Sequence, residues 1–440
     1  MKHSSALRKS LADRKLDNTP DDNDRFEIGP SQIAFDEWQK LGIQCPDMQA
    51  LREYRLGRVR QELKRRDYAG ILLFDPLNHR YATDSTNMQL WITHNSARAC
   101  FIATEGPVVM FDFHNCEHLS SHLPLISEIR DLTGFFYFTG GSRCEEFAEK
   151  FAGEIFDLLH ANSDGNFRLA VDRMEIVGVR AFERRGIEVL DDGMALMETA
   201  REIKNENELH AMRCAVAACE AALGEFEAAI TPGISENELW AYLHFGNIKR
   251  GGDWIETRIL SSGPRTNPWM AECGPRIIQD GDLVALDTDL IGVYGYCVDM
   301  SRTWLVGDGA ATAEQKTLFG VAYDHIMENM ELLKPGLTFK ELTFGGHQLP
   351  KQYRDLQYGV KYHGVGLCDE YPAIFYPEYW ESNGYDGVLE PGMCLCVEAY
   401  IGEVGGKEGV KLEDQVVITE NGYELLTRYP FDPKLLDREF

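Results

Sequence analysis

LVALDTDLIGVYGYCVDMSRTW, residues Leu283 to Trp304, opens as an apolar run, breaks at a turn and resumes as a second strand. It carries three carboxylates, Asp287, Asp289 and Asp299. Side chains at positions i and i+2 share one face of a strand, so Asp287 and Asp289 should point the same way. A hairpin that folds back after Gly292 would bring Asp299 opposite them. Buried carboxylates repel one another, and a divalent cation is the usual resolution. The stretch therefore predicts a cation site.

Three later residues extend this set. His363 heads HGVGL, a glycine-rich turn that would let the backbone approach a ligand. Glu398 lies within MCLCVEAY and Glu413 within VKLEDQVVI, both strand-like. An acid inside a strand is costly unless it is paired or metal-bound. Taken singly, each is more often a satisfied polar core group. Together, five carboxylates and one imidazole favour two divalent cations such as Mn, Fe, Co or Zn.

The composition excludes several classes of partner. The 440 residues suffice for two or three domains, and the net charge of -27 argues against nucleic acid or an anionic membrane. The acidity otherwise indicates solubility or a salty medium. The eleven cysteines are irregularly spaced, without a C-x-x-C pair, which favours a reducing compartment without disulfides. Neither a signal peptide nor a membrane-spanning run is recognisable, so we expect a cytoplasmic protein.

The chain divides into three parts. Residues 1–47 form a polar arm, residues 48–195 alternate strands with helices as a compact α/β domain does, and residues 196–440 hold the acidic motifs. Strands are expected at 71–74, 99–103, 107–113 and 169–172, and helices at 151–159 and 177–184. His114 and His118 stand four apart without a convincing helix, so a surface loop is favoured over a metal site.

The third part contains an internal repeat. Pro232-Gly-Ile-Ser235-Glu-Asn-Glu238-Leu resembles Pro335-Gly-Leu-Thr338-Phe-Lys-Glu341-Leu. Each copy reads as a helix end, a Pro-Gly turn and a capping box that opens the next helix. Long helices at 207–230 and 312–333 precede the two copies. The matching order predicts a domain with pseudo-twofold duplication and a site between its halves.

The order Asp…Asp…His-Gly-x-Gly…Glu…Glu resembles the pita-bread metallohydrolases, the family of methionine aminopeptidase, prolidase, X-Pro aminopeptidase and creatinase. The resemblance covers residues 50 to 440. It is carried by GYCVDMSRT at 295–303, HGVGL at 363–367 and LEDQVVIT at 412–419. It implies an α/β (α+β) fold, with a creatinase-like N-terminal domain at 48–195 and a pita-bread catalytic domain at 196–440. Creatinase-like relatives also imply a homodimer.

Departures from the peptidase pattern bear on function. The peptidases pair two aspartates eleven residues apart, whereas here Thr288 stands eleven before Asp299. A peptidase histidine is replaced by Trp269, and Asp369 stands near the place of a second one. Losing the histidines that serve a scissile amide while keeping the metal ligands argues against peptide hydrolysis. It argues equally against creatinase.

The pattern is similar to the dimethylsulfoniopropionate (DMSP) lyases of this fold, the DddP type. The resemblance implies cleavage of DMSP to dimethyl sulfide and acrylate, with iron the expected metal. The metal ligands would be Asp287, Asp289, Asp299, His363, Glu398 and Glu413. Which of Asp287 and Asp289 binds more tightly stays open.

The chemistry of the residues agrees with an elimination. A metal pair would bind the carboxylate of this small zwitterion and acidify the adjacent C–H, and Asp369 would remove the proton. Aromatic faces attract cations, so Trp269, Tyr358 and Tyr371 would line a sulfonium pocket, unless they are core packing. Asp369 could instead orient His363. Two alternatives remain: an X-Pro aminopeptidase or dipeptidase, and an inactive binding protein of this fold.

Overall fold

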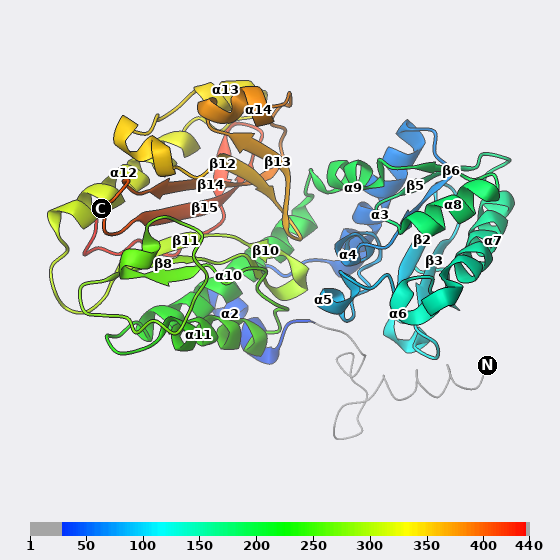
Figure 1. Ribbon diagram of the computed structural model, residues 1–440, viewed down its shortest axis with the longest axis horizontal. Helices are drawn as coiled ribbons and strands as arrows, with labels where there is room; N and C mark the ends of the chain where they lie inside the picture. Colours follow the sequence, from blue (N-terminus) through cyan, green and yellow to red (C-terminus); the bar gives the residue numbers. More distant parts are fainter. Residues whose placement is uncertain (1–28, 437–440) are drawn as a thin grey trace, which may run out of the picture. The chain divides into compact units, whose positions relative to one another are not determined.

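The computed structural model describes residues 29–436, and the chain forms two compact units (Figure 1). The first unit covers Asp47–Arg201. The second joins Gly29–Pro46 to the chain from Glu202 onward. In the part of the chain that the structure describes, no helix is long and apolar enough to cross a membrane.

The first unit is built on one six-stranded sheet with the order β4-β3-β2-β1-β5-β6. The β1–β2 and β2–β3 pairs are antiparallel, and the other pairs are parallel. Phe151, Ile155 and Leu159 of one long helix, α7, lie in the core with the buried residues of the sheet. The strands are β1 Gly70–Leu73, β2 Ala99–Ala103, β3 Val108–Asp112, β4 Glu128–Asp131, β5 Arg168–Val171 and β6 Glu188–Leu190.

Helices of the first unit occupy most of the expected places. The predicted helix at 151–159 is the centre of a longer one, and that at 177–184 begins one residue earlier. The helices are α3 Met48–Arg65, α4 Pro76–Thr83, α5 Gln89–Ile92, α6 Tyr137–Gly140, α7 Cys144–Asn162, α8 Ile176–Arg184 and α9 Gly193–Arg201, with 3-10 turns at Glu117–Leu119 and Gly141–Arg143.

The second unit contains three small sheets, ordered β11-β8-β7, β10-β9 and β13-β12-β14-β15-β16. Strands β11 and β15 lie side by side, because Thr303 Oγ1 donates to Lys411 O at 2.9 Å and accepts from Lys411 N at 3.2 Å. The strands are β7 Leu260–Ser262, β8 Leu283–Asp287, β9 Leu290–Ile291, β10 Cys297–Val298, β11 Ser301–Leu305, β12 Val360–Val365, β13 Asp369–Phe375, β14 Cys394–Ile401, β15 Val410–Ile418 and β16 Tyr423–Leu425.

The helices of the second unit repeat one order of elements. A long helix, α10 or α12, is followed by a Pro-Gly turn and a shorter helix, α11 or α13. Both predicted capping boxes are formed, by Ser235 with Glu238 and by Thr338 with Glu341. The helices are α2 Gln32–Leu41, α10 Glu206–Ala228, α11 Glu236–Lys249, α12 Ala313–Met330, α13 Phe339–Phe344 and α14 Trp380–Asn383. The 3-10 turns are Gly263–Thr266, Val293–Gly295, Lys351–Leu356 and Pro377–Tyr379.

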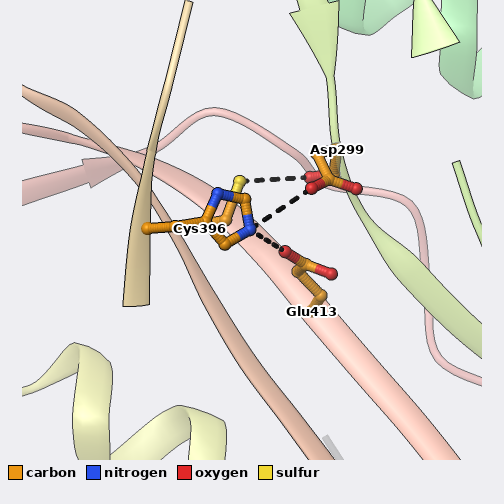
Figure 2. A group of neighbouring side chains, drawn as sticks. Asp299, Cys396 and Glu413 are labelled. Carbon is orange, nitrogen blue, oxygen red and sulfur yellow. Dashed lines mark hydrogen bonds and ion pairs between the residues drawn. The ribbon is translucent and has the colours of Figure 1, made fainter. Parts of the chain in front are cut away.

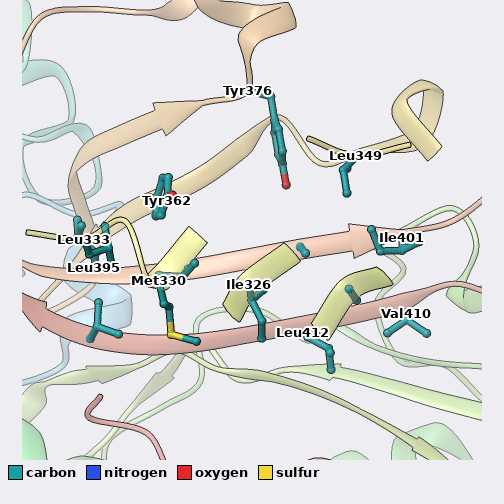
Figure 3. Packing of buried hydrophobic residues seen from close by; sticks show 14 of the residues in the cluster. Ile326, Met330, Leu333, Leu349, Tyr362, Tyr376, Leu395, Ile401, Val410 and Leu412 are labelled. Carbon is teal, nitrogen blue, oxygen red and sulfur yellow. The ribbon is translucent and has the colours of Figure 1, made fainter. Parts of the chain in front are cut away.

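The main core of this unit lies between α12 and the strands β14 and β15. Ile326 and Met330 of α12 pack with Leu395 and Leu412 of the two strands (Figure 3). Burial of each such side chain contributes about 1.5–3 kcal/mol. Because side chains alternate along a strand, the residues next to these core positions in the sequence point to the opposite face of the sheet. On β14 these are Cys396 and Glu398.

The segment Gly29–Pro46 contributes a helix to the second unit. The Trp38 side chain of α2 is fully buried, and its Nε1 donates to Cys214 O of α10 at 3.0 Å. Arg250 Nε lies 2.8 Å from Glu37 Oε2. Residues 29–46 of the predicted polar arm thus pack on the second unit, whereas residues 1–28 lie outside the described residues.

Candidate active site

The hairpin with the three aspartates is more broken than its sequence suggests. Strand β8 ends at Asp287, and Asp289 has a φ of 35°, outside strand geometry. The expectation that Asp287 and Asp289 share one face of a regular strand was therefore wrong. Thr288 holds the break, since its Oγ1 donates to Val298 O at 2.8 Å and accepts from Met300 N at 3.0 Å. Even so, one carboxylate oxygen each of Asp287, Asp289 and Asp299 lies within 4.8 Å of the others.

The five-stranded sheet brings the other predicted ligands to this place. His363 Nε2 lies 3.1 Å from Glu413 Oε1, 3.4 Å from Asp299 Oδ2 and 3.7 Å from Glu398 Oε1. Figure 2 shows Asp299, Cys396 and Glu413 pointing toward one another from three different strands or strand ends. We call Asp287, Asp289, Asp299, Glu398 and Glu413 the carboxylate cluster. The structure gathers all six predicted ligands, while their role in binding metal stays a prediction.

The donor set of the carboxylate cluster fits divalent cations. Among the described residues, Asp299 Oδ1 and Glu398 Oε1 are buried without a hydrogen-bond partner. An unpaired buried oxygen costs free energy that a bound cation recovers. Three oxygens also converge on one imidazole nitrogen, which is a donor set that first-row divalent ions accept.

Burial and the closeness of the carboxylates to one another shift the pKa values of the carboxylate cluster. Burial, with the Asp287 and Asp369 carboxylates, raises the pKa of Asp289 to about 8. Burial also raises the pKa of Glu398 to about 8 and that of Asp299 well above its ordinary value. Burial acts in the same direction on Glu413, but Lys411 and His363 outweigh it and lower that pKa. The cluster therefore holds protons at neutral pH that a cation would displace.

Sequence reasoning missed Lys411, which lies in the middle of the cluster. Its Nζ is 3.0 Å from Asp287 Oδ2, 3.0 Å from Glu398 Oε2 and 2.6 Å from Glu413 Oε2. The lysine stands two residues before Glu413 on β15, so both side chains share one strand face. That spacing was the available signal. Burial disfavours the ammonium, but these carboxylates outweigh it and raise the pKa of Lys411.

Ser301 and Cys396 were also missed. Ser301 Oγ donates to Asp287 Oδ1 at 2.6 Å, and it is the cross-strand partner of that aspartate. Cys396 stands opposite His363 on the paired strand, and its Sγ belongs to the group formed with Asp299, His363 and Glu413. A serine and a cysteine in apolar strands carry no distinctive sequence signal.

Asp369 lies at the edge of the site. It begins β13, its side chain is 48% exposed, and its Oδ1 is 3.7 Å from His363 Nδ1. Its partial burial and the neighbouring Glu413 and Asp287 carboxylates raise the pKa of Asp369, although His363 acts in the opposite direction.

The glycines of HGVGL make room for protein rather than for a ligand. A Cβ at Gly364 would lie 2.3 Å from Tyr371 O, and one at Gly366 would lie 2.1 Å from Glu370 Oε1. Both clashes are with β13, and the Glu370 carboxylate is paired with buried Lys204. The expected backbone approach to a ligand at this turn is therefore replaced by close strand packing.

Two of the three predicted aromatic residues adjoin the cluster. The Lys411 Nζ lies 5.6 Å from the Trp269 ring centroid and 6.0 Å from that of Tyr358. Tyr371 instead stacks on Tyr385 at 5.7 Å and contacts Phe339 edge-on at 5.8 Å. Trp269 and Tyr358 thus form a wall beside a cation, while a pocket role for Tyr371 stays a prediction.

The histidine pair of the first unit has another environment. His114 is exposed, and its Nδ1 lies 2.7 Å from Asp131 Oδ2. Within residues 29–436, both groups of side chains spaced to hold a metal ion belong to the carboxylate cluster and its neighbours.

Comparisons with known proteins agree with this geometry. Residues 210–420 match the model of metallopeptidase family M24. The chain is 52% identical over 427 residues to dimethylsulfoniopropionate lyase DddP of Roseovarius nubinhibens, covering 96% of each chain. It is 47% identical over 446 residues to dimethylsulfoniopropionate lyase DddP of Roseobacter denitrificans, covering 100% of each.

Solved structures support the fold. The X-Pro aminopeptidase of Thermotoga maritima superposes with a TM-score of 0.68 at 20% identity, covering 86% of this chain and 98% of that one. Together with the family match, this confirms the predicted two-domain α/β architecture with a pita-bread domain.

Proposed function

The chain belongs to the family of the dimethylsulfoniopropionate lyases DddP, and we propose on that basis that it cleaves DMSP to dimethyl sulfide and acrylate. The observation that carries this proposal is identity of 52% and 47% across almost the whole length of two relatives with that name. The chain is thus an enzyme, a carbon–sulfur lyase. Its substrate is a small zwitterion.

The reaction is a β-elimination. A base removes a proton from the carbon next to the carboxylate, the C–H electron pair forms the C=C bond of acrylate, and the C–S bond breaks with its pair on sulfur. Dimethyl sulfide leaves as a neutral molecule, so the residues need not supply an acid.

The metal ligands proposed are Asp287, Asp289, Asp299, His363, Glu398 and Glu413. The unpaired oxygens of Asp299 and Glu398 and the raised pKa values of Asp289 and Glu398 support binding of divalent ions. When bound, the ions supply Lewis-acid polarisation of the substrate carboxylate, which makes the adjacent C–H more acidic. Iron is proposed, with Zn, Mn or Co as the other candidates, and elemental analysis of the purified protein decides among them.

Asp369 is proposed as the base. Its carboxylate stands at the edge of the cluster and is partly open to solvent, so it can accept a proton from substrate and release it to water. A raised pKa gives Asp369 a stronger pull on that proton than an ordinary carboxylate has.

Trp269 and Tyr358 are proposed to face the sulfonium. Both rings lie beside the Lys411 ammonium, which supports a role for them next to positive charge. Tyr371 is the weaker member of this set because its ring packs on Tyr385 and Phe339.

Assembly and location are separate proposals. We propose a homodimer from the resemblance to creatinase-type proteins; Phe245 and Ile248 of α11 expose apolar side chains that such an interface would cover. A cytoplasmic location is proposed from the eleven cysteines, all within the described residues and all free thiols. Light scattering on the purified protein tests the dimer.

Headspace chromatography tests the function. Purified metal-loaded protein supplied with DMSP should release dimethyl sulfide and acrylate in equal amounts. Release of an amino acid from an X-Pro dipeptide, with no dimethyl sulfide from DMSP, would contradict the lyase proposal and favour the peptidase alternative.

A further inference from the structure

Two glutamates of the carboxylate cluster occupy an unfavourable position. Glu398 and Glu413 are direct cross-strand partners on β14 and β15, and both are almost fully buried. Like charges directly opposite each other destabilise a sheet. Something must therefore compensate this pair before any ion binds.

Lys411 provides that compensation from one side. Glu398 and Glu413 each turn Oε2 to the Lys411 ammonium, and each turns Oε1 toward His363. Both carboxylate oxygens of Asp287 are also held, since Oδ2 accepts from Lys411 Nζ and Oδ1 accepts from Ser301 Oγ. One ammonium thus fixes the rotation of three carboxylates from two sheets.

The ammonium is itself held in place. Ser301 Oγ lies 2.8 Å from Lys411 Nζ, the rings of Trp269 and Tyr358 cover it, and the side chain is 1% exposed. A lysine with this many fixed partners is not a mobile surface charge.

The net charge of the carboxylate cluster depends on the residue at position 411. Once cations have displaced the protons of the carboxylate cluster, its five carboxylates carry -5, and Lys411 adds +1, giving -4. Two divalent ions would bring the carboxylate cluster with Lys411 to zero, and the only negative charge left at the site would be that of Asp369 at its edge. With a neutral residue at position 411 the loaded cluster would carry -1 and would repel an anionic carboxylate group. One unit of charge at such short range changes the affinity for an anion by about tenfold or more.

We propose that Lys411 is a positioning residue that sets the net charge of the carboxylate cluster, so that the metal-loaded cluster is neutral and admits a substrate carboxylate. This rests on the proposed function for the identity of the substrate. The holding of the three carboxylates does not depend on it. Lys411 touches no reacting atom, so its loss acts on substrate affinity and on metal binding rather than on proton removal.

The test compares Lys411→Met with the wild type. The first readout uses Mn²⁺ alone as the probe and measures Tm before and after its addition to chelator-stripped protein. The metal-induced rise in Tm should be larger in Lys411→Met, by about 5 °C or more, because the ion then replaces the missing ammonium. The second readout is kinetic: KM for DMSP should rise by about tenfold or more, and kcat should change less.

A matched control removes a different buried ammonium. Lys361 is fully buried and donates to the carbonyls of Leu342 and Gly345 rather than to a carboxylate. Lys361→Met should lower Tm equally with and without Mn²⁺. If Lys411→Met does not fold, Lys411→Gln serves, since it is equally uncharged and more polar.

Inhibition by a charged and by an uncharged ligand distinguishes the effect of the lost Lys411 charge from an effect on packing. Acrylate should inhibit the Lys411 variants at least about tenfold more weakly than it inhibits the wild type, whereas uncharged acrylamide should not discriminate. Equal metal-induced Tm shifts in variant and wild type, or an unchanged KM, would overturn the proposal. If the wild type releases no dimethyl sulfide but the Tm shifts differ as stated, the lyase assignment fails while the role of Lys411 stands.

Discussion

The Asp369 side chain is 48% exposed, whereas those of Glu398 and Glu413 are 3% and 1% exposed. This contrast separates a group that can exchange protons with water from groups suited to hold an ion. Asp369→Asn should therefore lower kcat for dimethyl sulfide release by about 10²–10⁴-fold while the metal content stays unchanged. Headspace chromatography and elemental analysis of one preparation measure both quantities.

Asp369→Glu is the matched variant, because it keeps the carboxylate and moves it by one methylene. It should retain measurable turnover. Near-normal activity in Asp369→Asn would show that Asp369 only orients His363 and that another group takes the proton.

Proton release should accompany metal binding. In the metal-free chain Asp289 and Glu398 have pKa values of about 8, so both are mostly protonated at pH 7. A cation must displace these protons, so its apparent affinity should rise with pH until about 8. Calorimetric titration with Mn²⁺ in two buffers of different ionisation enthalpy counts the protons. Equal heats in both buffers would contradict the prediction.

The same pKa values set the pH dependence of stability. The folded metal-free chain binds these protons more tightly than the unfolded chain, whose carboxyls titrate near pH 4. Their stabilisation is therefore fully present below about pH 4 and is lost as the pH rises through about 8. The Tm of metal-free protein should fall over that range, and bound metal should flatten the curve.

Individual ligands were easier to predict than their environment. The six ligand candidates could be predicted because acids inside apolar strands are conspicuous in sequence. Lys411 was missed although it stands two residues before Glu413, because a lysine in an apolar strand is more often a residue whose end reaches solvent. Only the meeting of β8, β14 and β15 shows that its ammonium is surrounded by carboxylates.

At the scale of elements, the break between β8 and β9 shapes the site. Thr288 stands at this break, and its hydroxyl bonds to Val298 and Met300 across the hairpin. Thr288→Val removes that hydroxyl at constant shape and leaves a buried carbonyl and amide unsatisfied. It should lower the free energy of unfolding by about 1–3 kcal/mol and reduce metal occupancy. Urea denaturation and elemental analysis provide the measurements.

Thr317→Val is the control for this change. Thr317 lies on α12 and its exposed hydroxyl bonds only within the helix, to Ala313 O. Its replacement should leave metal occupancy unaltered. Equal effects of both variants would mean that the Thr288 hydroxyl has no special role.

The helix starts could be predicted from residues close in sequence, whereas the irregular backbone at Asp289 could not. Ser235 and Thr338 open helices as their capping boxes predicted, because a cap depends on residues within one turn. Asp289 has a φ of 35°, and it accepts hydrogen bonds from the Thr257 hydroxyl and the Glu256 backbone N–H, which lie some thirty residues earlier. Periodicity within a short window carries no information about such partners.

At the scale of the whole molecule, the chain enters the second unit, leaves it for the first, and returns. Trp38 anchors the early segment, with its side chain fully buried and its Nε1 bonded to Cys214 O. Trp38→Ala should lower the free energy of unfolding by about 3–5 kcal/mol. Phe35→Ala is the control, since that side chain is 37% exposed on the same helix and should cost much less.

Domain limits were harder to predict than domain content. The α/β character of residues 48–195 follows from the alternation of strands and helices. The docking of residues 29–46 does not, because a ten-residue amphipathic helix carries no indication of which unit covers its apolar side.

The second unit is formed from two separate stretches of the chain, which makes fragment complementation possible. Residues 29–46 belong to it by packing alone, since the covalent path to Glu202 runs through the whole first unit. A chain that begins at Asp47 should therefore be complemented by a synthetic peptide of residues 29–46 added in trans, with recovery of Tm that saturates as the peptide concentration rises. A peptide with alanine in place of Trp38 should fail to complement, which makes the segment a removable part whose affinity for its site can be titrated.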